Sequence, residues 1–581
     1  MAVKDTDFWQ FVRSNIIGRN KLIRTPFGER IVTYADYTAS GRGLDFVEHY
    51  MHYVMEEYAN THTDDDTTGE VMTQRLHRAE HIIKEHVHAN EDYKIIEVGS
   101  GSTGAINRLQ EILGVYIPPA TRKRLEEIYR GYFNGKDADE FYEFYMAHRP
   151  VAFVGPYEHH SNEITWRECF TEVVEIHLSK TGEIDLDDLY KKVSDKKYKE
   201  RVKIGSFSAA SNVTGIVTPV YDVAGILHEN GAYAFFDFAA SAPYVKIDVN
   251  RDKKSYFDAV FYSPHKFLGG PGSCGVLVFR KQLYHSELPP SYSGGGTVDF
   301  VNYDLTKYSN AIEVREKPGT PPILQTLRAA LAMEIKDKLG IEDIKERENS
   351  LIRKVFDHFS GIPQVEILGN PDPEKRIAIF SFNIKDGRSY LHPRFVIKLL
   401  NDLFGIQGRA GCACAGPYGH RLLNIDRDKS MEIYKEIIDR GNMGVKPGWA
   451  RVNFHYLMTD EEVNFLMNAI DFVSAYGKYF LGLYAFNIKT GSWSRAEKMR
   501  DLWVDNGRFG VDEALDVFQS SIYTEGKKKE RMDGEALKSI YKEYLEEAGK
   551  LGRRLKSSFN EENLRTTSRE FIPYLYCAIT P

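Results

Sequence analysis

Long apolar runs are missing from this chain of 581 residues, and no stretch of it is long and apolar enough to cross a membrane. The start, MAVKDTDFWQFVRSNIIGRN, also lacks the apolar core of a secretory signal peptide. Positive charge is not in excess, because 76 basic residues stand against 83 acidic ones and give a formal net charge of -7. Such a chain has no cationic field to draw it onto nucleic acid or anionic lipid. We therefore expect a cytoplasmic protein that binds neither nucleic acid nor a membrane.

Cysteine is scarce, and its odd, sparse distribution argues against a disulfide framework and is typical of a reducing compartment. Cys412 and Cys414 could be half of a metal site, but no second pair of cysteines is present to complete it. The HRAEH segment from His77 to His81 matches a zinc-protease pattern, yet its polar surroundings suit a solvated helix face. We expect no metal centre. The five cysteines are Cys169, Cys274, Cys412, Cys414 and Cys577.

The length exceeds what one hydrophobic core supports, so at least two domains are expected. We expect an N-terminal segment of residues 1–30 that contributes to the smaller domain, followed by a large domain of residues 31–310. A smaller domain of residues 311–475 and a helical C-terminal extension of residues 476–581 are expected to follow. Apolar residues at helical spacing predict an inserted helical hairpin at about 111–148.

Between residues 93 and 279, short β-rich runs alternate with helical stretches, which predicts parallel strands joined by crossover helices in an α/β layer structure. Residues 325–359 predict a long helical passage, and strand candidates after it suit a smaller α+β domain. Residues 494–506 and 534–556 predict polar helices before an irregular end. The β-rich runs are residues 94–98, 151–155, 174–178, 202–208, 233–238, 257–263 and 274–279, and the later strand candidates are residues 365–368, 377–384 and 450–456.

The clearest local signal is FDAVFYSPHKFLGGPGSCGVLVF, in which Lys266 lies between two apolar strands. Burial disfavours an ammonium ion and lowers the amine pKa, as a Schiff-base lysine requires. A surface lysine on a hairpin is the alternative reading of this segment. Asp237 ends the strand of YAFFDF, at the end of an α/β strand where ligands bind, and it could pair with a pyridinium nitrogen. Its alternative role is a structural acid that caps the next turn.

The segment IIEVGSGSTGAINRLQEIL predicts a strand, a turn and a helix, whose backbone N–H groups and Ser102 and Thr103 hydroxyls can bind a phosphate. Its glycines, Gly99, Gly101 and Gly104, also satisfy the GxGxxG pattern of dinucleotide-binding folds. The acid that such folds need about 20 residues later would fall in the helical insertion, which disfavours a nicotinamide enzyme. A Walker A loop is excluded because no GK[ST] follows.

These motifs, in this order over nearly the first 475 residues, resemble the class V aminotransferase-fold enzymes, most closely the cysteine desulfurase and selenocysteine lyase branch. The cysteine loop is also similar to that of molybdenum-cofactor sulfurases. The resemblance implies the pyridoxal 5'-phosphate (PLP) fold type I, which is aspartate aminotransferase-like. Its large domain has a mainly parallel seven-stranded sheet, and its smaller domain is α+β. The resemblance also implies PLP on Lys266 and a homodimer with the active site at the subunit interface.

The resemblance assigns roles to single residues. YADYTAS, with Asp36 to Ser40, matches the family's substrate loop. EHHSNEITW places His159 on the cofactor ring, SAASNVTG places Asn212 near its phenolic oxygen, and DFAAS makes Asp237 the partner of the pyridinium nitrogen. Where the family commonly has glutamine, this chain has Ala240. The implied phosphate contacts are Ser102, Thr103, Ser263, His265 and, reaching a neighbouring subunit, Thr297.

The loop GIQGRAGCACAGP matches the family pattern RxGxxCxxP, which points to Cys414 as sulfur acceptor and Arg409 as a carboxylate ligand. Arg451 matches the main clamp for the substrate carboxylate, a task that suits a bidentate guanidinium. Asn212 completes the implied substrate-binding set. The implied catalytic residues are Lys266, Cys414, His159 and Asp237.

The implied reaction converts L-cysteine to L-alanine with a persulfide on Cys414, from which a sulfur-acceptor protein could take the sulfur. A PLP-dependent aminotransferase, epimerase or C–S lyase acting on another amino acid is the alternative. A non-catalytic binding or assembly module of the same fold is a more distant one. The insertion, the extra Cys412 and the C-terminal extension are atypical of the family, and the sequence does not disclose their roles.

Overall fold

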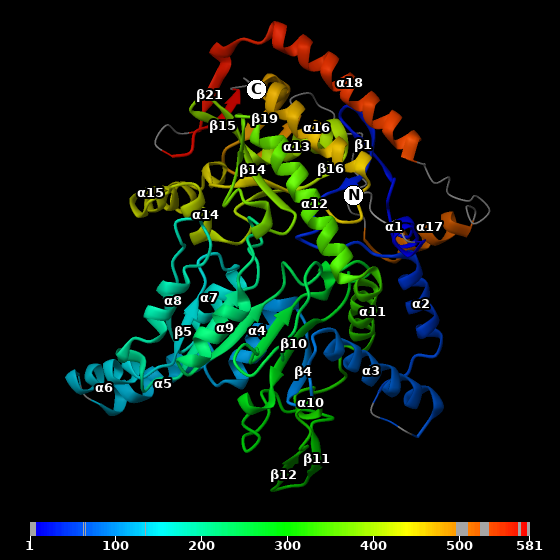
Figure 1. Ribbon diagram of the computed structural model, residues 1–581. Coiled ribbons are helices and arrows are strands. Elements are labelled where there is room, and N and C mark those ends of the chain that lie inside the picture. The colour runs from blue at the N-terminus through cyan, green and yellow to red at the C-terminus, as the bar shows by residue number, and fades with distance from the viewer. Residues whose placement is uncertain are drawn as a thin grey trace.

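A computed structural model of the protein describes residues 7–61, 63, 65–133, 135–495, 509–522, 534–567 and 571–577. Two layered units lie one above the other in Figure 1: an α/β unit below and a smaller α+β unit above.

A seven-stranded sheet forms the centre of the α/β unit, with the strand order β4-β10-β9-β8-β7-β5-β6. All neighbouring strands are parallel except the pairs that β10 forms with β4 and β9. The predicted mainly parallel seven-stranded sheet is confirmed, although β6 begins before its predicted run. The strands are β4 (Tyr93–Val98), β5 (Val151–Val154), β6 (Glu172–Glu175), β7 (Lys203–Ser208), β8 (Ala232–Asp237), β9 (Ala259–Tyr262) and β10 (Gly275–Arg280).

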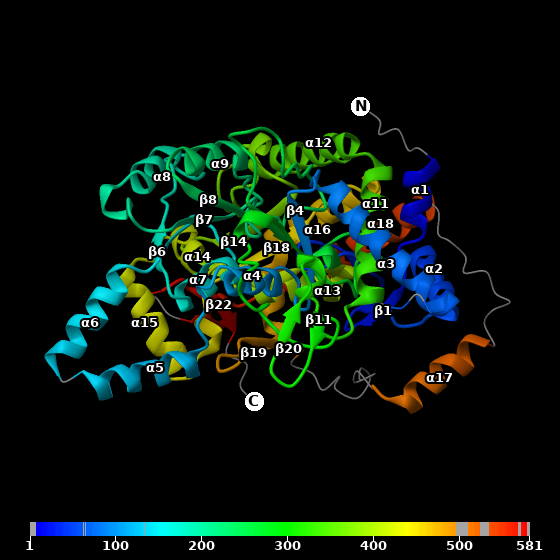
Figure 2. The same cartoon turned by 90° about the horizontal axis from the view of Figure 1, so that it is seen from below.

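Successive side chains of these strands point to opposite faces of the sheet, and helices bury both faces. In β10, Leu277 and Phe279 belong to the core on one side, and Val276 and Val278 to the core on the other. Figure 2 shows the helices on the two faces. They are α4 (Gly101–Ile112) and α7 (His160–Glu168) on one face, and α8 (Leu186–Val193) and α9 (Val220–Glu229) on the other.

The carboxyl ends of the parallel strands meet at one edge of the sheet. Ser208 is the last residue of β7, Asp237 is the last residue of β8, and the 3-10 turn η2 (Pro264–Lys266) follows β9. The turn between β4 and α4 lies at the same edge, because β4 runs in the same direction as β9. This is the edge at which α/β sheets bind ligands.

A second seven-stranded sheet forms the smaller unit, with the order β17-β18-β14-β15-β22-β21 and with β13 paired to β14. Its pairs are antiparallel except β15 with β22. Helices α12 (Ile341–Ser360), α13 (Pro393–Phe404) and α16 (Asp460–Tyr476) pack with it. The strands are β13 (Val365–Ile367), β14 (Ile379–Asp386), β15 (Ser389–Leu391), β17 (Arg409–Gly411), β18 (Trp449–Asn453), β21 (Leu564–Thr566) and β22 (Tyr574–Cys577).

The predicted long helical passage is divided into two helices, α11 (Ile323–Leu339) and α12. Gly340, with φ of +86°, separates them, because that conformation cannot continue a right-handed helix. The helical hairpin predicted for the insertion is formed by α5 (Pro119–Tyr132) and α6 (Lys136–Ala147), which project from the body in Figure 2.

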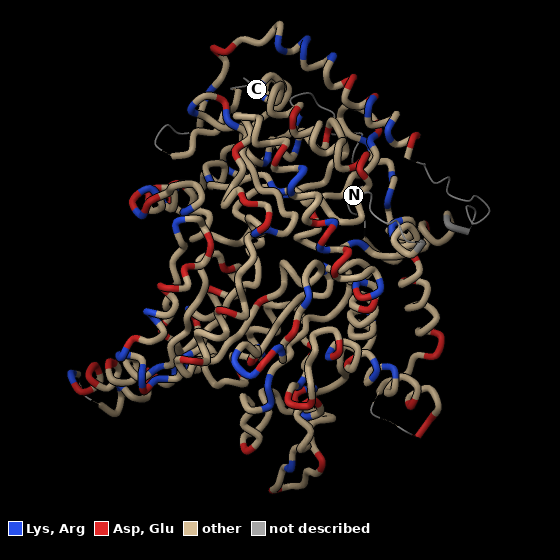
Figure 3. Tube along the Cα trace, viewed as in Figure 1, with Lys and Arg blue, Asp and Glu red and all other residues tan. Residues whose placement is uncertain are grey.

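The N-terminal segment begins with α1 (Asp7–Ser14), and residues 22–34, which include its end, pack on the smaller unit. These residues form β1 (Leu22–Thr25), β2 (Gly28–Ile31) and β3 (Thr33–Tyr34). Strands β1 and β2 pair with each other and lie against α13, and β3 pairs in parallel with β16 (Ile406–Gln407). Basic and acidic residues are interspersed over both units (Figure 3). No helix among the described residues has the length and apolar character needed to span a membrane.

The C-terminal extension is only partly helical. Of the helix predicted at 494–506, residues 496–506 lie outside the described residues, and residues 494 and 495 belong to a strand instead. The predicted irregular end instead contains β21 and β22, and β22 pairs with β15, so the extension adds two strands to the sheet of the smaller unit. Before them come β19 (Tyr484–Asn487), β20 (Ser492–Arg495), α17 (Val511–Ile522) and α18 (Gly534–Ser558).

Helix α18 arches over the top of the smaller unit in Figure 1 and buries one stripe of side chains against it. Tyr541 stacks on Phe465 of α16 with ring centroids 3.9 Å apart, and its hydroxyl lies 3.4 Å from the Thr33 hydroxyl. Tyr544 accepts a hydrogen bond from the Ile31 backbone N–H at 3.2 Å. The extension therefore shares a core with both the N-terminal segment and α16.

We predict that Tyr541→Ala lowers the free energy of unfolding of the smaller unit by about 3 kcal/mol, since it removes a buried aromatic ring and leaves a cavity. Urea unfolding, followed by fluorescence, measures the shift. Lys542→Ala on the exposed face of the same helix is the control and should leave the midpoint unchanged. Equal midpoints for the two variants would show that α18 is not packed as described.

Candidate functional site

A cavity of about 230 Å³ lies between the carboxyl edge of the large sheet and the smaller unit. Every site residue predicted from the sequence lines it, with the exception of Thr297. Thr297 is buried in its own loop, where its hydroxyl donates to the Gly294 carbonyl at 2.7 Å. The expected contact of Thr297 with a neighbouring subunit therefore stays a prediction.

Lys266 and Asp237 share the floor of the cavity. The Lys266 side chain is partly buried, and no described residue accepts a hydrogen bond from its Nζ. Burial lowers the pKa of Lys266 to about 8, although the Asp237 charge acts in the opposite direction. Burial raises the pKa of Asp237, while hydrogen bonding from the Ala239 N–H at 2.9 Å and the charge of Lys266 oppose this rise.

The turn between β4 and α4 faces the same cavity through Ser100, Ser102 and Thr103. The Ser102 N–H donates to Ser263 Oγ at 2.8 Å, and the Ser102 hydroxyl donates to Asp237 Oδ1 at 3.0 Å. A Cβ atom on Gly104 would lie 2.0 Å from the Gly99 carbonyl oxygen, so this position requires glycine. These contacts connect the predicted phosphate turn to Asp237 and to Ser263, which lies three residues before Lys266.

Two histidines on the cavity wall are held neutral at pH 7. Burial, together with the charge of Lys266, lowers the pKa values of His159 and His265 to about 4 each. Nδ1 of His159 accepts a hydrogen bond from the Ser161 N–H at 3.1 Å, which places the proton of the neutral ring on Nε2. His159 lines the cavity, so its neutral ring can contact a ligand there.

Both arginines predicted for the substrate carboxylate already contact a carboxylate of the protein. Asp36 Oδ1 lies 3.1 Å from Arg451 Nη2, and Asp36 Oδ2 lies 3.0 Å from Arg409 Nε. Arg451 also donates through Nη1 to the Asn212 carbonyl at 2.8 Å, while its buried Nε has no hydrogen-bond partner among the described residues. The sequence placed Asp36 in a substrate loop, but no local pattern indicated this bridge.

The predicted sulfur-accepting loop exposes Cys414 and half-buries Cys412. Ala413 and Cys414 both have positive φ, +48° and +55°, a conformation that L-residues adopt at a cost. Three hydrogen bonds hold the loop on the α/β unit: Asn212 Nδ2 to the Ala413 carbonyl at 2.7 Å, the His160 N–H to the Cys414 carbonyl at 2.9 Å, and the Gly416 N–H to His160 Nε2 at 3.1 Å.

Two of these contacts were not foreseen. His160 follows the predicted ring-stacking histidine directly, and the repeated histidine of EHH is the one signal that could have drawn attention to it. The Asn212 amide, expected near the cofactor's phenolic oxygen, here donates to the cysteine loop, and its buried Oδ1 has no partner among the described residues.

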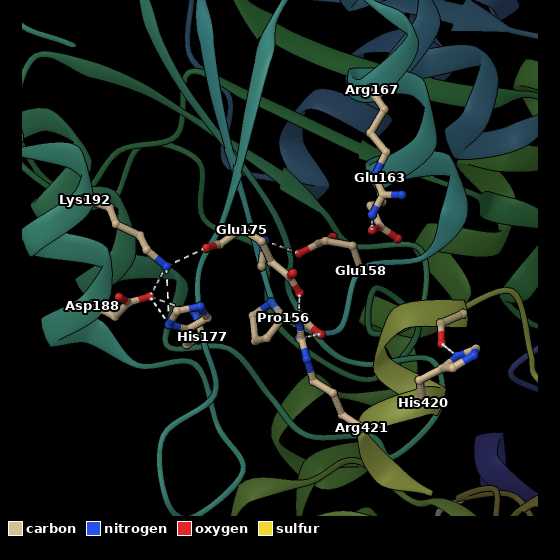
Figure 4. Close-up of polar contacts among 12 residues, drawn as sticks. Pro156, Glu158, Glu163, Arg167, Glu175, His177, Asp188, Lys192, His420 and Arg421 are labelled. Atoms are coloured by element: carbon tan, nitrogen blue, oxygen red, sulfur yellow. Dashed lines mark hydrogen bonds and ion pairs between the residues drawn. The ribbon is translucent and has the colours of Figure 1, made fainter. Parts of the chain in front are cut away.

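The cysteine loop continues into α14 (Gly416–Leu422), which is anchored on the α/β unit. Arg421 of α14 donates to the Pro156 carbonyl at 3.1 Å and forms an ion pair with Glu175 of β6. Figure 4 shows Arg421 reaching between these two residues. The loop therefore has one end on the smaller unit, at β17, and the other end on the α/β unit.

Among the described residues, no group of histidine, cysteine, aspartate or glutamate side chains is arranged to hold a metal ion. His81 of the HRAEH segment instead pairs with Glu85 on the exposed side of α3 (Thr67–His86).

Comparison with known proteins gives a consistent result. The sequence profile of the family described as Aminotransferase class-V matches residues 145–466. A probable cysteine desulfurase from Halalkalibacterium halodurans is 30% identical over 392 residues, covering 66% of this chain and 84% of that protein. One from Staphylococcus aureus is 26% identical over 449 residues, covering 76% of this chain and 92% of that protein.

Solved structures share the fold. The apo cysteine desulfurase from Thermococcus onnurineus NA1 superimposes with a TM-score of 0.61 at 23% identity, covering 80% of this chain and 98% of that chain. A NifS-like protein from Rickettsia africae gives a TM-score of 0.54 at 15% identity, covering 76% of this chain and 98% of that chain. The predicted fold type is thereby confirmed.

We predict that the Lys266 amine reacts with an aldehyde with a pH midpoint near 8. Below that pH the amine is protonated, so that roughly a tenth of it is neutral at pH 7. Asp237→Asn should move the midpoint lower, because the Asp237 charge favours the ammonium form. The experiment follows borohydride-trapped pyridoxal on the Lys266 peptide of cofactor-free protein by mass spectrometry, with the exposed Lys180 as internal reference. A midpoint near 10.5, the ordinary lysine value, would contradict the burial of this amine.

Proposed function

Because the chain belongs to the class-V aminotransferase family, whose members depend on PLP, we propose that it is a cysteine desulfurase that releases L-alanine and keeps the sulfur on Cys414. The single observation that carries this proposal is the exposed Cys414 thiol on the wall of the cavity that contains Lys266. An aminotransferase or an epimerase needs the lysine but has no use for a thiol at that position.

The residues present fit PLP. An amine with a lowered pKa, a buried carboxylate and the glycine turn at the N-terminus of α4 surround one cavity, and the amine has no hydrogen-bond partner among the described residues. When bound, PLP supplies an aldehyde for covalent attachment and a ring that withdraws electrons from the substrate carbon. In our proposal Lys266 holds the aldehyde, Asp237 faces the ring nitrogen and His159 stacks on the ring. Ser102, Thr103, Ser263 and His265 hold the phosphate.

Proton transfer at the substrate carbon falls to Lys266 in this proposal. Its pKa of about 8 leaves part of the amine neutral at pH 7, and Nζ in that form takes the proton from Cα. His159 and His265, with pKa values of about 4, stay neutral and do not compete for this proton. Asp237 supplies the negative charge that keeps the floor of the cavity balanced.

The substrate carboxylate has to bind next to Asp36. Arg451 offers its unpartnered Nε, and Arg409, which is half exposed, is bound by Asp36 only through Nε. We therefore propose that the substrate carboxylate is shared between the two guanidinium groups, with Asp36 still in place. Ala240, where relatives commonly have glutamine, lines the cavity without adding a hydrogen bond.

Sulfur transfer is assigned to Cys414. Its thiolate attacks the sulfur of the substrate, so that an S–S bond forms as the Cβ–S bond breaks and the electron pair stays with the substrate carbon. Protonation of that carbon gives L-alanine, and the protein keeps the sulfur as a persulfide. Atoms balance without an oxidant, since L-cysteine and a thiol give L-alanine and a persulfide. The persulfide is then available to a sulfur-acceptor protein.

The proposal includes a homodimer with the site at the subunit interface. Thr297 leads into a two-stranded arm, β11 (Val298–Val301) and β12 (Thr306–Tyr308), which projects at the bottom of Figure 1. Phe300 of this arm is 57% exposed, and Tyr303 at its tip is fully exposed. An exposed apolar arm supports contact with a second subunit, which would bring the Thr297 loop toward the neighbouring phosphate site.

We predict that Cys414→Ser abolishes alanine formation from L-cysteine, lowering the rate at least 100-fold, because a hydroxyl is a far weaker nucleophile than a thiolate. Cys412→Ser, two residues away, is the matched control and should keep most of the activity. Alanine is measured by chromatography, and the persulfide by mass spectrometry of the peptide that carries Cys414.

The outcomes separate the candidate reactions. Unchanged alanine production by Cys414→Ser would refute sulfur transfer to this residue. A keto acid or ammonia as the product, with no persulfide, would identify an aminotransferase or a C–S lyase instead. Lys266→Ala should abolish every one of these reactions together with the yellow absorbance of bound PLP.

A further inference from the structure

The last described strand, β22, comes more than 100 residues after the last residue that lines the cavity, but it supports the backbone at Gly448, next to the cavity wall. The family profile ends at residue 466, so that the C-terminal extension lies outside it. Strand β22 pairs in parallel with β15 and becomes part of the sheet that carries Arg409 and Arg451. The extension is thus part of the same sheet as β17 and β18, which carry the two arginines of the cavity wall.

One side chain of β22 makes a specific contact with that wall. The buried Tyr574 hydroxyl accepts a hydrogen bond from the Gly448 N–H at 3.1 Å and lies 3.4 Å from the Gly448 carbonyl oxygen, to which it donates. The backbone N–H and carbonyl of Gly448 are therefore both hydrogen-bonded by the Tyr574 hydroxyl. A buried N–H without a partner lowers the population of its local conformation about tenfold or more.

Gly448 in turn supports the start of the cysteine loop. A Cβ atom on Gly448 would lie 2.8 Å from both the Cα and the carbonyl carbon of Gly411, so that the two backbones are in direct contact. The next residue, Trp449, pairs with Gly411 in the β17–β18 ladder. Gly411 is followed directly by Cys412, and Cys414 is two residues further on.

We propose that the C-terminal strand holds the sulfur-accepting loop in place through the Tyr574 hydroxyl, which makes Tyr574 a positioning residue for Cys414. This inference rests on the proposed function of Cys414. It assigns the C-terminal extension a role in positioning Cys414. The role is indirect, because Tyr574 contributes no atom to the cavity lining. The strained conformation of Ala413 and Cys414 makes the loop dependent on such external support.

The test compares Tyr574→Phe with Tyr576→Phe in the full-length, PLP-loaded protein. Both variants remove one hydroxyl from the same strand, but the Tyr576 hydroxyl has no hydrogen-bond partner among the described residues. In Tyr574→Phe we expect single-turnover persulfide formation on Cys414 to fall about tenfold, while the dissociation constant of L-cysteine, read from the cofactor absorbance, changes less than twofold. Tyr576→Phe should match the wild-type protein in both measurements.

A second readout does not depend on turnover. The rate of alkylation of Cys414 by iodoacetamide, relative to that of Cys412 in the same sample, should change in Tyr574→Phe and stay constant in Tyr576→Phe. A lowered thermal midpoint with unchanged alkylation and persulfide rates would reduce Tyr574 to a structural role and overturn the inference. An altered alkylation ratio in a protein that forms no persulfide would support the inference while refuting the proposed function.

The wild-type protein offers a further test that requires no variant. Hydrogen exchange in increasing urea should show that the peptides covering residues 409–416 and 571–577 lose protection together, since one contact couples them. Loss of protection in 571–577 while 409–416 stays protected would overturn the inference.

Discussion

The site depends on a topological constraint: strands that run in parallel end at one edge, and the groups that follow them must meet there. Asp237 and the lysine turn are brought together in this way. The opposite wall of the cavity belongs to the smaller unit, so the site requires the two units to keep a fixed relative position. The loop of residues 36–41 maintains this position, because the Gly41 N–H donates to the His265 carbonyl at 2.9 Å and the Thr38 N–H donates to Asn453 Oδ1 at 2.8 Å. A single short loop thus joins the lysine turn to β18, the strand that carries Arg451.

Charge balance within the cavity follows from burial. Two guanidinium groups on paired strands would repel each other in a partly desolvated wall, and Asp36 between Arg409 and Arg451 removes this conflict before any ligand arrives. A ligand carboxylate accordingly meets a wall that is already partly neutralised. Lys266 and Asp237 obey the same rule, but there the desolvation of the amine outweighs the attraction and leaves a pKa of about 8. Arg409 and Arg451 therefore stay positively charged, whereas Lys266 can lose its proton near neutral pH.

Sequence patterns were sufficient to predict those features that depend on residues close together in the chain. The strand runs were predicted because apolar β-formers alternate with helical stretches, and Lys266, Asp237 and the turn at Ser102 were predicted because each motif lies within a few residues. The Asp36 bridge joins residues that are 415 positions apart, and the support of the cysteine loop by His160 spans 256 positions. No periodicity or spacing encodes such contacts, so they follow only from the assembled fold. The same holds for β21 and β22, since short strands at the end of a polar segment acquire their structure from the sheet they join.

The geometry of the cysteine loop shows why distant elements matter to a reactive thiol. Left-handed backbone at Ala413 and Cys414 costs about 1–2 kcal/mol per residue, and a loop left to itself would relax to an unstrained shape. The strain persists because both ends are fixed, at Arg421 on one side and at the Gly411–Gly448 contact on the other. A rigid support keeps an exposed thiol facing the cavity, whereas a mobile loop would present it in many orientations. Any segment that lengthens or braces the sheet beneath Gly411 therefore acts on the position of the thiol, even when its own side chains never reach the cavity.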